Sequence, residues 1–300
     1  MRRRAAFLGL LGALALPGAA LARCEGVVPG QRVQNADRDF VGQDLDEIVE
    51  RGWIEFAVYE DLPPYSWEEG GEPQGIDIGL GRIIAEALGV EPRFRFVTSG
   101  ENLEADLRYN VWQGLPMGGA DNIVANVMLH VPYDSTFACR VEQVVFSGQA
   151  YREQVAIAYR QDVYPEDVPT PAYFRFDLVA VENDTIADFY LASFEGGQMN
   201  ANIRRFPSMA LAMEALNRGD VPAAMGPRAM LEAGAGSGVL VATPPLPGLA
   251  VGAWTVGIAV HHSHRDLGYA VDDAIAAALA DGRVAALFEN AGLSFTPPER

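Results

Sequence analysis

Positive charge is scarce in this sequence. Its 22 lysine and arginine residues stand against 40 aspartate and glutamate residues, which gives the 300-residue chain a formal net charge of −18. Nucleic acids and anionic lipid surfaces bind proteins through basic patches. The charge balance therefore argues against both as partners, and it favours solubility and docking to basic proteins.

Motifs of catalysis and cofactor binding are also missing from the sequence. It contains no glycine-rich phosphate-binding loop and no serine nucleophile elbow. His261, His262 and His264 are the nearest approach to a metal-binding cluster, but their place after an apolar strand favours a solvated turn on an exposed loop. We therefore expect no cofactor, no metal and no enzymatic activity.

Apolar residues, by contrast, are plentiful. They make up 49% of the chain and charged residues only 21%, which is enough for packed cores and argues against disorder. The length fits one large domain or two of ordinary size.

Residues 1–22 have the composition of a secretory signal peptide. Arg2, Arg3 and Arg4 precede a short apolar stretch, and residues 20–22 read Ala-Leu-Ala. The stretch is too short to span a membrane, and a buried N-terminal helix would not need the arginines. Cleavage would remove three arginines and no acid, so the formal net charge would fall from −18 by three to −21. We expect an exported protein with no membrane insertion after signal removal.

The chain has only two cysteines, Cys24 and Cys139, and both follow the expected signal peptide. In an oxidising compartment they could form a disulfide that holds the N-terminal segment beside Arg140. The alternative is a pair of unpaired thiols.

Hydrophobic periodicity predicts an α/β fold in two parts. In the first part we expect strands at 53–60, 93–97 and 125–130, a helix at 75–90, and two strand-like runs within 142–160. In the second part we expect a strand and helix within 177–194, a helix at 208–220 with Ser208 as its N-cap, a short strand at 221–226 and a glycine-rich loop at 232–239. A long apolar strand at 251–260 and two helical stretches within 266–293 complete the chain.

This succession resembles the periplasmic solute-binding proteins of family 3, the amino-acid type. The resemblance lies in stretches such as WIEFAVYEDLPPYSW, GIDIGLGRIIAEALGV, RVEQVVFSGQAYRE and RRFPSMALAMEALNRGDVPAAMG, which occur in the family's order. It implies a two-lobed Venus flytrap with two crossing hinge strands, near 151–158 and 252–258. The implied domains are a signal peptide at 1–22, lobe 1 at 23–152 with its return at 253–300, and lobe 2 at 153–252.

The resemblance also implies a ligand site between the lobes. Arg140 lies six residues before Phe146, where the family's arginine grips the ligand's α-carboxylate, and Ser135 takes the place of a hydroxyl partner. The alternative is an Arg140 paired with Glu142, with Asp134 or with the backbone of its own lobe. The other residues expected at the site are Tyr65, Trp67, Asp61, Thr185 and Pro227.

Two positions depart from the amino-acid pattern. Pro227 stands where the family usually places the aspartate that neutralises the ligand's ammonium group, and Asp184 brings a negative charge to the loop that usually contacts the carboxylate. An ordinary amino acid is therefore not the expected ligand. His130 ends a buried strand beside the cleft, and a hydrogen-bonded structural role is the favoured interpretation.

The stretches LRYNVWQGLPMGG, NVMLHVPYD and AAMGPRA resemble the MxaJ/XoxJ-like branch, which is associated with PQQ-dependent alcohol dehydrogenases. This resemblance implies an accessory protein whose partner is the dehydrogenase, a cytochrome c, or both. The alternatives are a substrate-binding receptor of an ABC importer for a small polar or carboxylate solute, and an enzyme of the cyclohexadienyl dehydratase type. We disfavour the enzyme because the expected cleft shows no clear acid–base pair.

Overall fold

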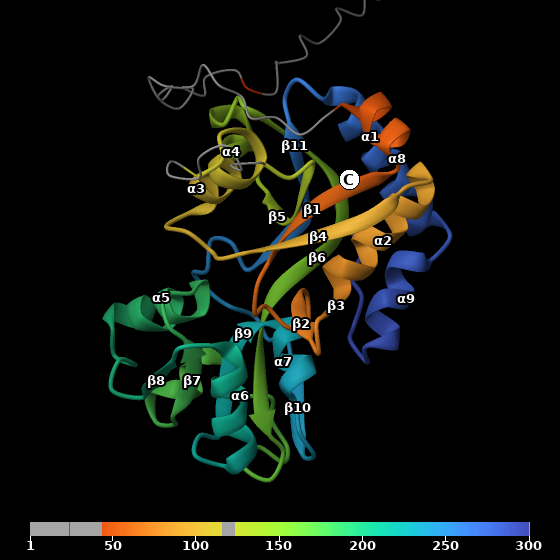
Figure 1. Ribbon diagram of the computed structural model, residues 1–300. Coiled ribbons are helices and arrows are strands. Elements are labelled where there is room, and N and C mark those ends of the chain that lie inside the picture. Colours follow the sequence, from red (N-terminus) through yellow and green to blue (C-terminus); the bar gives the residue numbers. More distant parts are fainter. Residues whose placement is uncertain (1–23, 25–43, 116–123, 300) are drawn as a thin grey trace, which may run out of the picture.

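The computed structural model describes residue 24 and residues 44–115 and 124–299. The expected signal peptide lies outside the described residues. Two α/β bodies lie one above the other and are connected by β-strands (Figure 1). This two-lobed arrangement is the fold expected from the sequence.

The upper body, lobe 1, is built around a mixed sheet. Its strands are β1 (Trp53–Tyr59), β4 (Glu91–Val97), β5 (Val127–Tyr133), β11 (Ala253–His261) and the first half of β6 (Val144–Arg160). Its helical segments are α1 (Leu45–Arg51), α2 (Ile76–Leu88), α3 (Leu103–Leu107), η1 (Arg108–Trp112), α4 (Ser135–Arg140), α8 (Arg265–Ala280) and α9 (Arg283–Asn290). A small hairpin of β2 (Trp67–Glu69) and β3 (Glu72–Gln74) lies at the lower edge of this lobe (Figure 1).

The lower body, lobe 2, contains the second half of β6. Its other strands are β7 (Val179–Glu182), β8 (Ile203–Phe206), β9 (Ala223–Pro227) and β10 (Val239–Ala242). Its helical segments are η3 (Pro171–Arg175), α5 (Ile186–Ser193), η4 (Phe194–Gly196), α6 (Met209–Arg218) and α7 (Arg228–Gly234).

A single path of hydrogen-bonded strands connects the two lobes, in the order β4-β1-β5-β11-β6-β9-β7-β8, with β10 also paired to β6. The long strand β6 belongs to both lobes: its residues 144–154 pair with β11, and its residues 155–159 pair with β9. At the crossing, the Val155 N–H donates to the Gly252 carbonyl at 2.8 Å, just before β11 begins. The chain therefore passes between the lobes near the two positions expected for the hinge strands.

Local sequence explains the best-defined helices. Ser208 caps α6 by accepting a hydrogen bond from the Leu211 N–H at 3.4 Å, and Gly219 ends the helix in the left-handed conformation at φ 83°. Gly75 precedes α2 at φ 117°, and a Cβ there would lie 2.1 Å from the Tyr65 carbonyl oxygen. Only glycine therefore lets the start of α2 pack against the loop that carries Tyr65.

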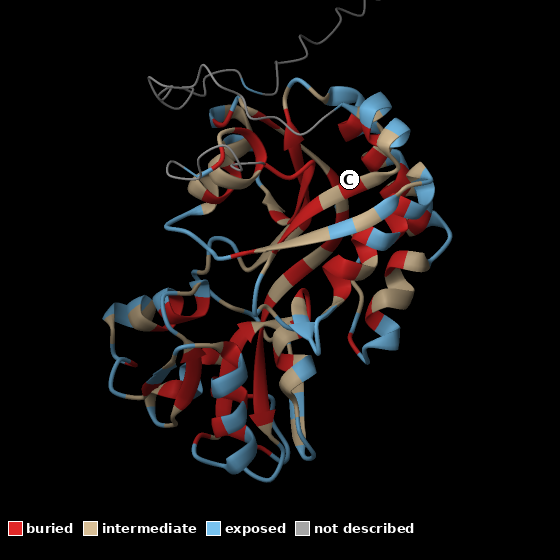
Figure 2. Ribbon diagram, in the orientation of Figure 1, coloured by how far each residue is buried: buried red, intermediate tan, exposed pale blue. Residues whose placement is uncertain are grey.

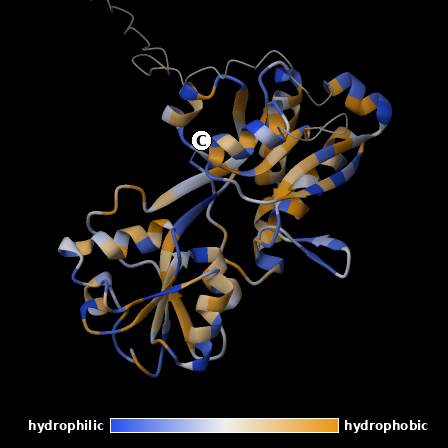
Figure 3. Cartoon of the chain, turned by 60° about the vertical axis from the view of Figure 1, so that its left-hand side comes forward, coloured by the Kyte–Doolittle hydropathy of each residue, from blue (hydrophilic) through white to orange (hydrophobic). Residues whose placement is uncertain are grey.

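Buried residues follow the strands and the inner helix faces of each lobe (Figure 2), and hydrophobic segments gather in the same places (Figure 3). The largest cluster lies between the lobe 1 sheet and α2, α8 and α9. Two further clusters fill lobe 2 on either side of its sheet. None of the helices in the described part of the chain has the length and apolarity that crossing a bilayer requires.

The structure differs from the sequence-based elements in three places. Residues 135–140, for which no element was expected, form α4, and residues 228–234, which run into the expected glycine-rich loop, form α7. Residues 144–160 form one strand, although the sequence indicated two runs. Gly148 explains the difference, because its positive φ of 57° coincides with a change of register against β11 and so interrupts the periodicity.

Candidate functional site

A cavity of about 660 Å³ lies between lobe 1, the hinge and lobe 2. Its size is within the range of small-molecule sites, about 300–1,000 Å³. The lining combines aromatic and aliphatic side chains with a few charged ones. The lining residues are His130, Pro132, Tyr133, Asp134, Ser135, Arg152, Ile186, Val251, Ala253, Trp254, Thr255 and Glu299. They come from β5, the start of α4, β6, α5, β11 and the C-terminal tail.

His130 reaches this cavity from an irregular point in β5. Val131 pairs with Gly257 and Met128 with Ala259, so β5 has one residue more than β11 in this interval, which is a β-bulge. His130 has a φ of 57°, a left-handed conformation that costs roughly 1–3 kcal/mol for a residue with a side chain. The bulge turns β5 and alters the direction in which its side chains point.

Behind His130 lies a buried carboxylate. His130 Nδ1 is 2.9 Å from Asp77 Oδ2, and the Tyr151 hydroxyl is 3.2 Å from Asp77 Oδ1 and 3.0 Å from His130 Nδ1. The side chain of Asp77 is 1% exposed and that of His130 is 17% exposed. Asp77 lies in the first turn of α2, where the helix dipole favours a negative charge. A histidine that opens on the cavity therefore has its inner nitrogen fixed by a buried acid.

A second buried acid, Glu153, adjoins the first. Its carboxylate accepts hydrogen bonds from the Tyr65 hydroxyl, from the Gln154 N–H at 2.7 Å and from the Arg228 N–H at 3.1 Å. Burial, with the neighbouring Glu153 carboxylate, raises the pKa of Tyr65 well above its ordinary value. The phenol therefore stays protonated and acts as a permanent donor.

Tyr151 is held in the same way. Burial raises the pKa of its phenol well above the ordinary value, with the Asp77 carboxylate as the next cause. The Tyr65 and Tyr151 rings are nearly parallel, with centroids 6.2 Å apart, and the Tyr65 ring lies 4.4 Å from that of His130. The stacked rings form a rigid layer behind the histidine.

Arg152 is the guanidinium group of the cavity wall. It lies on β6 at the hinge, with its side chain 35% exposed, and it forms an ion pair with Glu299 of the C-terminal tail. The backbone fixes this tail, because the Arg152 N–H donates to the Thr296 carbonyl at 2.9 Å. The Arg228 guanidinium also donates to the Ser294 carbonyl at 2.9 Å. The guanidinium group of the cavity, Arg152, is therefore already paired with a carboxylate of the protein itself, that of Glu299.

The structure brings one of the residues expected from the sequence, Ser135, into the cavity wall. Arg140 ends α4 as an exposed residue, with its Cζ atom 5.7 Å from the centre of the Phe137 ring, and is not among the described residues that line the cavity. The expected carboxylate-binding role of Arg140 stays a prediction.

Tyr65, Trp67 and Asp61 come from the segment after β1. Tyr65 is 2% exposed and lies behind the cavity wall. Trp67 begins β2 and is half-buried, and Asp61 is exposed with a φ of 50°. None of the three belongs to the described lining of the cavity, so the structure places these residues beside the cavity or behind its wall.

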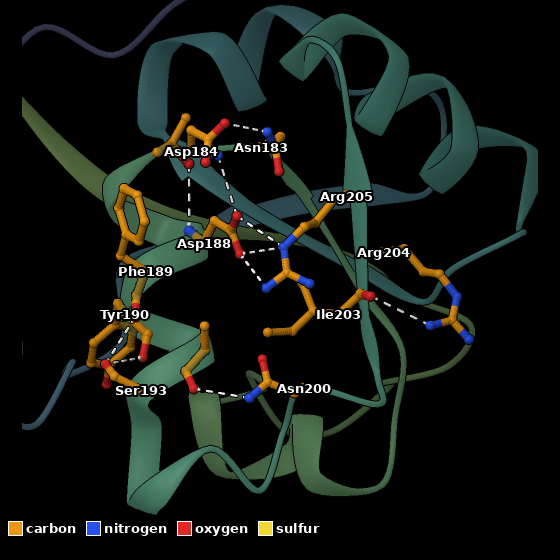
Figure 4. Close-up of polar contacts among 12 residues, drawn as sticks. Asn183, Asp184, Asp188, Phe189, Tyr190, Ser193, Asn200, Ile203, Arg204 and Arg205 are labelled. Carbon is orange, nitrogen blue, oxygen red and sulfur yellow. Dashed lines mark hydrogen bonds and ion pairs between the residues drawn. The ribbon is translucent and has the colours of Figure 1, made fainter. Parts of the chain in front are cut away.

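In lobe 2, the polar groups of Thr185 and Asp184 have partners within the chain. The Thr185 hydroxyl donates to the Glu182 carbonyl at 2.8 Å and caps α5 by accepting from the Asp188 N–H at 3.4 Å. Asp188 also accepts from the Asp184 N–H at 3.2 Å and forms an ion pair with Arg205 (Figure 4). These contacts occupy backbone N–H groups at the start of α5 that could otherwise hold a carboxylate.

Pro227 ends β9, pairs with Val155 of β6 and immediately precedes α7. The next residue, Arg228, contributes its N–H to the buried Glu153. At the position where the family pattern has an acid that faces the ligand, this chain therefore has Pro227, followed by a residue that binds the buried Glu153.

Cys24 and Cys139 form a disulfide, with their Cα atoms 5.4 Å apart. The bond attaches the N-terminal side of the chain to α4, near Arg140.

The histidine cluster differs from its expectation in one respect. His261 belongs to β11 and is only 2% exposed, whereas an exposed loop was expected. Within residues 44–115 and 124–299, no three histidine, cysteine or acidic residues converge as a metal site would require.

Sequence reasoning did not single out Arg152, Trp254 or Glu299. Arg152 and Trp254 lie within the expected hinge regions, so their position at the cleft was foreseeable. Glu299 could not be found in that way, because its place depends on how the C-terminal tail folds back on β6.

Comparison with solved structures finds the same fold in amino-acid-binding proteins. An ancestral cationic amino acid solute-binding protein is 22% identical, with a TM-score of 0.66 over 82% of this chain and 98% of that chain. An amino acid ABC transporter substrate-binding protein from Streptococcus pneumoniae, bound to L-arginine, is 20% identical with a TM-score of 0.59 over 85% and 100%. A solute receptor for L-cysteine from Neisseria gonorrhoeae is 20% identical with a TM-score of 0.56 over 83% and 93%. No family model and no curated protein matches the chain.

Proposed function

We propose that this protein is a solute-binding receptor of the periplasm that holds a small organic carboxylate between its two lobes. The observation that carries the proposal is Arg152, which lies in the cavity wall and already holds the carboxylate of Glu299. A guanidinium group binds any carboxylate through the same charge-assisted hydrogen bonds. A solute that replaces Glu299 would keep this interaction and fill the cavity.

The rest of the lining supports a solute with an apolar body. Tyr133 and Trp254 provide aromatic surfaces, and Ile186 and Val251 provide aliphatic surfaces from the side of lobe 2. Pockets of this kind bind by apolar contact and use a few polar groups for orientation. The fold is compatible with the same function, because one protein that shares it is bound to L-arginine and another is a solute receptor for L-cysteine.

The proposal is tested with two probes that share one ring and differ in charge: phenylacetate and phenethylamine. We expect phenylacetate to bind in calorimetry and phenethylamine not to bind. Arg152→Gln should weaken phenylacetate binding by about ten- to a hundred-fold, because a hydrogen bond to a charged group contributes about 1.5–3 kcal/mol. Arg218→Gln, on the exposed surface of α6, is the matched control and should bind as the wild type does. Binding of the amine alone, unchanged in the Arg152 variant, would contradict the proposal.

A second candidate is the accessory role for a PQQ-dependent dehydrogenase or its cytochrome c. It rests on the sequence resemblance, and the excess of 40 acidic over 22 basic residues favours docking to a basic protein. The pocket test does not decide this candidate, which is tested by the salt dependence of its association with the partner.

A further inference from the structure

His130 combines an unusual backbone conformation with a position in the cavity wall. Three features coincide at this residue: a left-handed backbone within a bulge, a fixed hydrogen bond from its inner nitrogen, and an edge that lines the cavity. Strained backbone and bulges concentrate at functional sites, where they re-aim side chains.

We propose that His130 is a protonatable recognition group of the cavity, whose imidazolium form donates from Nε2 to the anionic group of the solute. The inference rests on the proposed function and adds to Arg152 a second side chain that binds the anionic group of the solute. Nδ1 lies against Asp77 and Tyr151. The opposite edge of the ring therefore remains for a solute.

A buried acid lies beside the ring and can pair with the imidazolium form. Asp77 is a fully buried acid, and a buried carboxylate without a positive partner is costly. Within the described residues, His130 is the basic side chain in direct contact with it. Tyr151 adds a neutral hydrogen bond and no positive charge.

The environment of His130 contains further charged groups that the test must separate from it. The groups behind the ring are Asp77 of α2, Tyr59 of β1, Tyr65 of the following loop, and Tyr151 and Glu153 of β6. The groups around the cavity are Tyr133 of β5, Asp134 before α4, Arg152 of β6 and Glu299 of the tail. The nearby residues of β11, such as Thr255, do not titrate. Histidine is the side chain that ordinarily changes charge between pH 5 and 8.

The direction of the pH effect follows from which form binds the anion. When pH rises, the imidazolium loses its proton and its positive charge, so affinity for an anion falls. The limiting slope is about tenfold in the dissociation constant per pH unit, as for any group that must hold one proton to bind. Phenylacetate stays ionised from pH 6 to 9, so it reports the protein's titration alone.

The test is calorimetric titration of the exported protein with phenylacetate at pH 6, 7, 8 and 9. We expect the wild type to bind at least about tenfold more tightly at pH 6 than at pH 9. His130→Asn should abolish this difference and lower affinity at pH 6 by about tenfold, and asparagine tolerates the left-handed backbone. His262→Asn, in the turn that follows the far end of β11, is the matched control and should keep the wild-type profile.

An independent measurement uses the wild type alone. In NMR, phenylacetate should raise the pH at which the His130 ring signal titrates, because the bound anion stabilises the imidazolium. Two results would overturn the role of His130 and leave the receptor proposal intact. One is an affinity for phenylacetate that depends on Arg152 but does not change with pH. The other is a His130 ring signal that titrates at the same pH in the free and in the saturated protein. Failure of the wild type to bind phenylacetate at any pH would overturn both.

Discussion

At the scale of single residues, the charge balance of the cavity depends on which carboxylate the Arg152 guanidinium holds. Glu299 is its partner in the structure, although the Glu299 side chain is 74% exposed. Exposed ion pairs contribute only about 0.2–1 kcal/mol to stability. A solute carboxylate that also gains apolar contacts in the cavity would therefore displace Glu299. The tail then acts as an intramolecular competitor for the arginine.

This competition predicts that Glu299→Gln binds phenylacetate more tightly than the wild type, by about two- to five-fold, which corresponds to the loss of a surface ion pair. Calorimetry at constant pH measures the change. Glu289→Gln, at an exposed acid of α9 away from the cavity, is the control and should leave affinity unchanged. Weaker binding by the Glu299 variant would show that the tail supports the solute instead of competing with it.

At the scale of elements, the disulfide joins Cys24 to α4 across a long stretch of the chain. Its two cysteines are 115 positions apart in the chain. Closing a loop of that length restricts the unfolded chain, and native disulfides typically stabilise by about 2–4 kcal/mol.

We therefore predict that Cys139→Ser lowers the free energy of unfolding in urea by about 2–4 kcal/mol, and that Cys24→Ser has the same effect. The double variant is the control: it should lose no more than either single variant, because both remove the same bond. Unreduced exported protein should show no labelled thiol in mass spectrometry after denaturation, and two after reduction. Two labelled thiols without reductant would rule out the bond in the exported protein.

At the scale of the whole molecule, the excess of acidic residues creates a long-range negative field. Such a field speeds encounter with a basic partner, and salt screens it with a Debye length of about 8 Å at physiological ionic strength. The same field slows the approach of a small anion only weakly, because binding in the cavity depends on the short-range pairing with Arg152.

If the accessory role holds, association with the PQQ-dependent dehydrogenase or its cytochrome c should slow steeply between low and moderate salt, while dissociation changes little. Surface plasmon resonance at 20, 50, 150 and 300 mM salt measures both rates. Phenylacetate binding serves as the internal control and should vary much less over the same range. An absence of binding at every salt concentration, or binding that ignores salt, would remove electrostatic docking as the basis of the accessory role.

Much of the fold follows from the sequence alone. The periodicity of residues 75–90 and the cap residues Ser208 and Gly219 specify α2 and α6 by local chemistry, and the structure has these helices where the sequence predicts them. The helices α4 and α7 were not predicted, because six or seven residues provide too few turns for a periodic signal.

The candidate site follows from the sequence to a smaller extent. Hydrophobic periodicity and turn residues are local properties, and they predicted two α/β parts. The two crossings and the cleft between the lobes were implied by the family resemblance. Tertiary structure alone decided what faces the cleft. The bulge at His130, the burial of Asp77 and Glu153, and the return of Glu299 onto Arg152 join residues far apart in the chain. No local pattern encodes these contacts, because each depends on the register of β5 against β11 or on the path of the tail across β6.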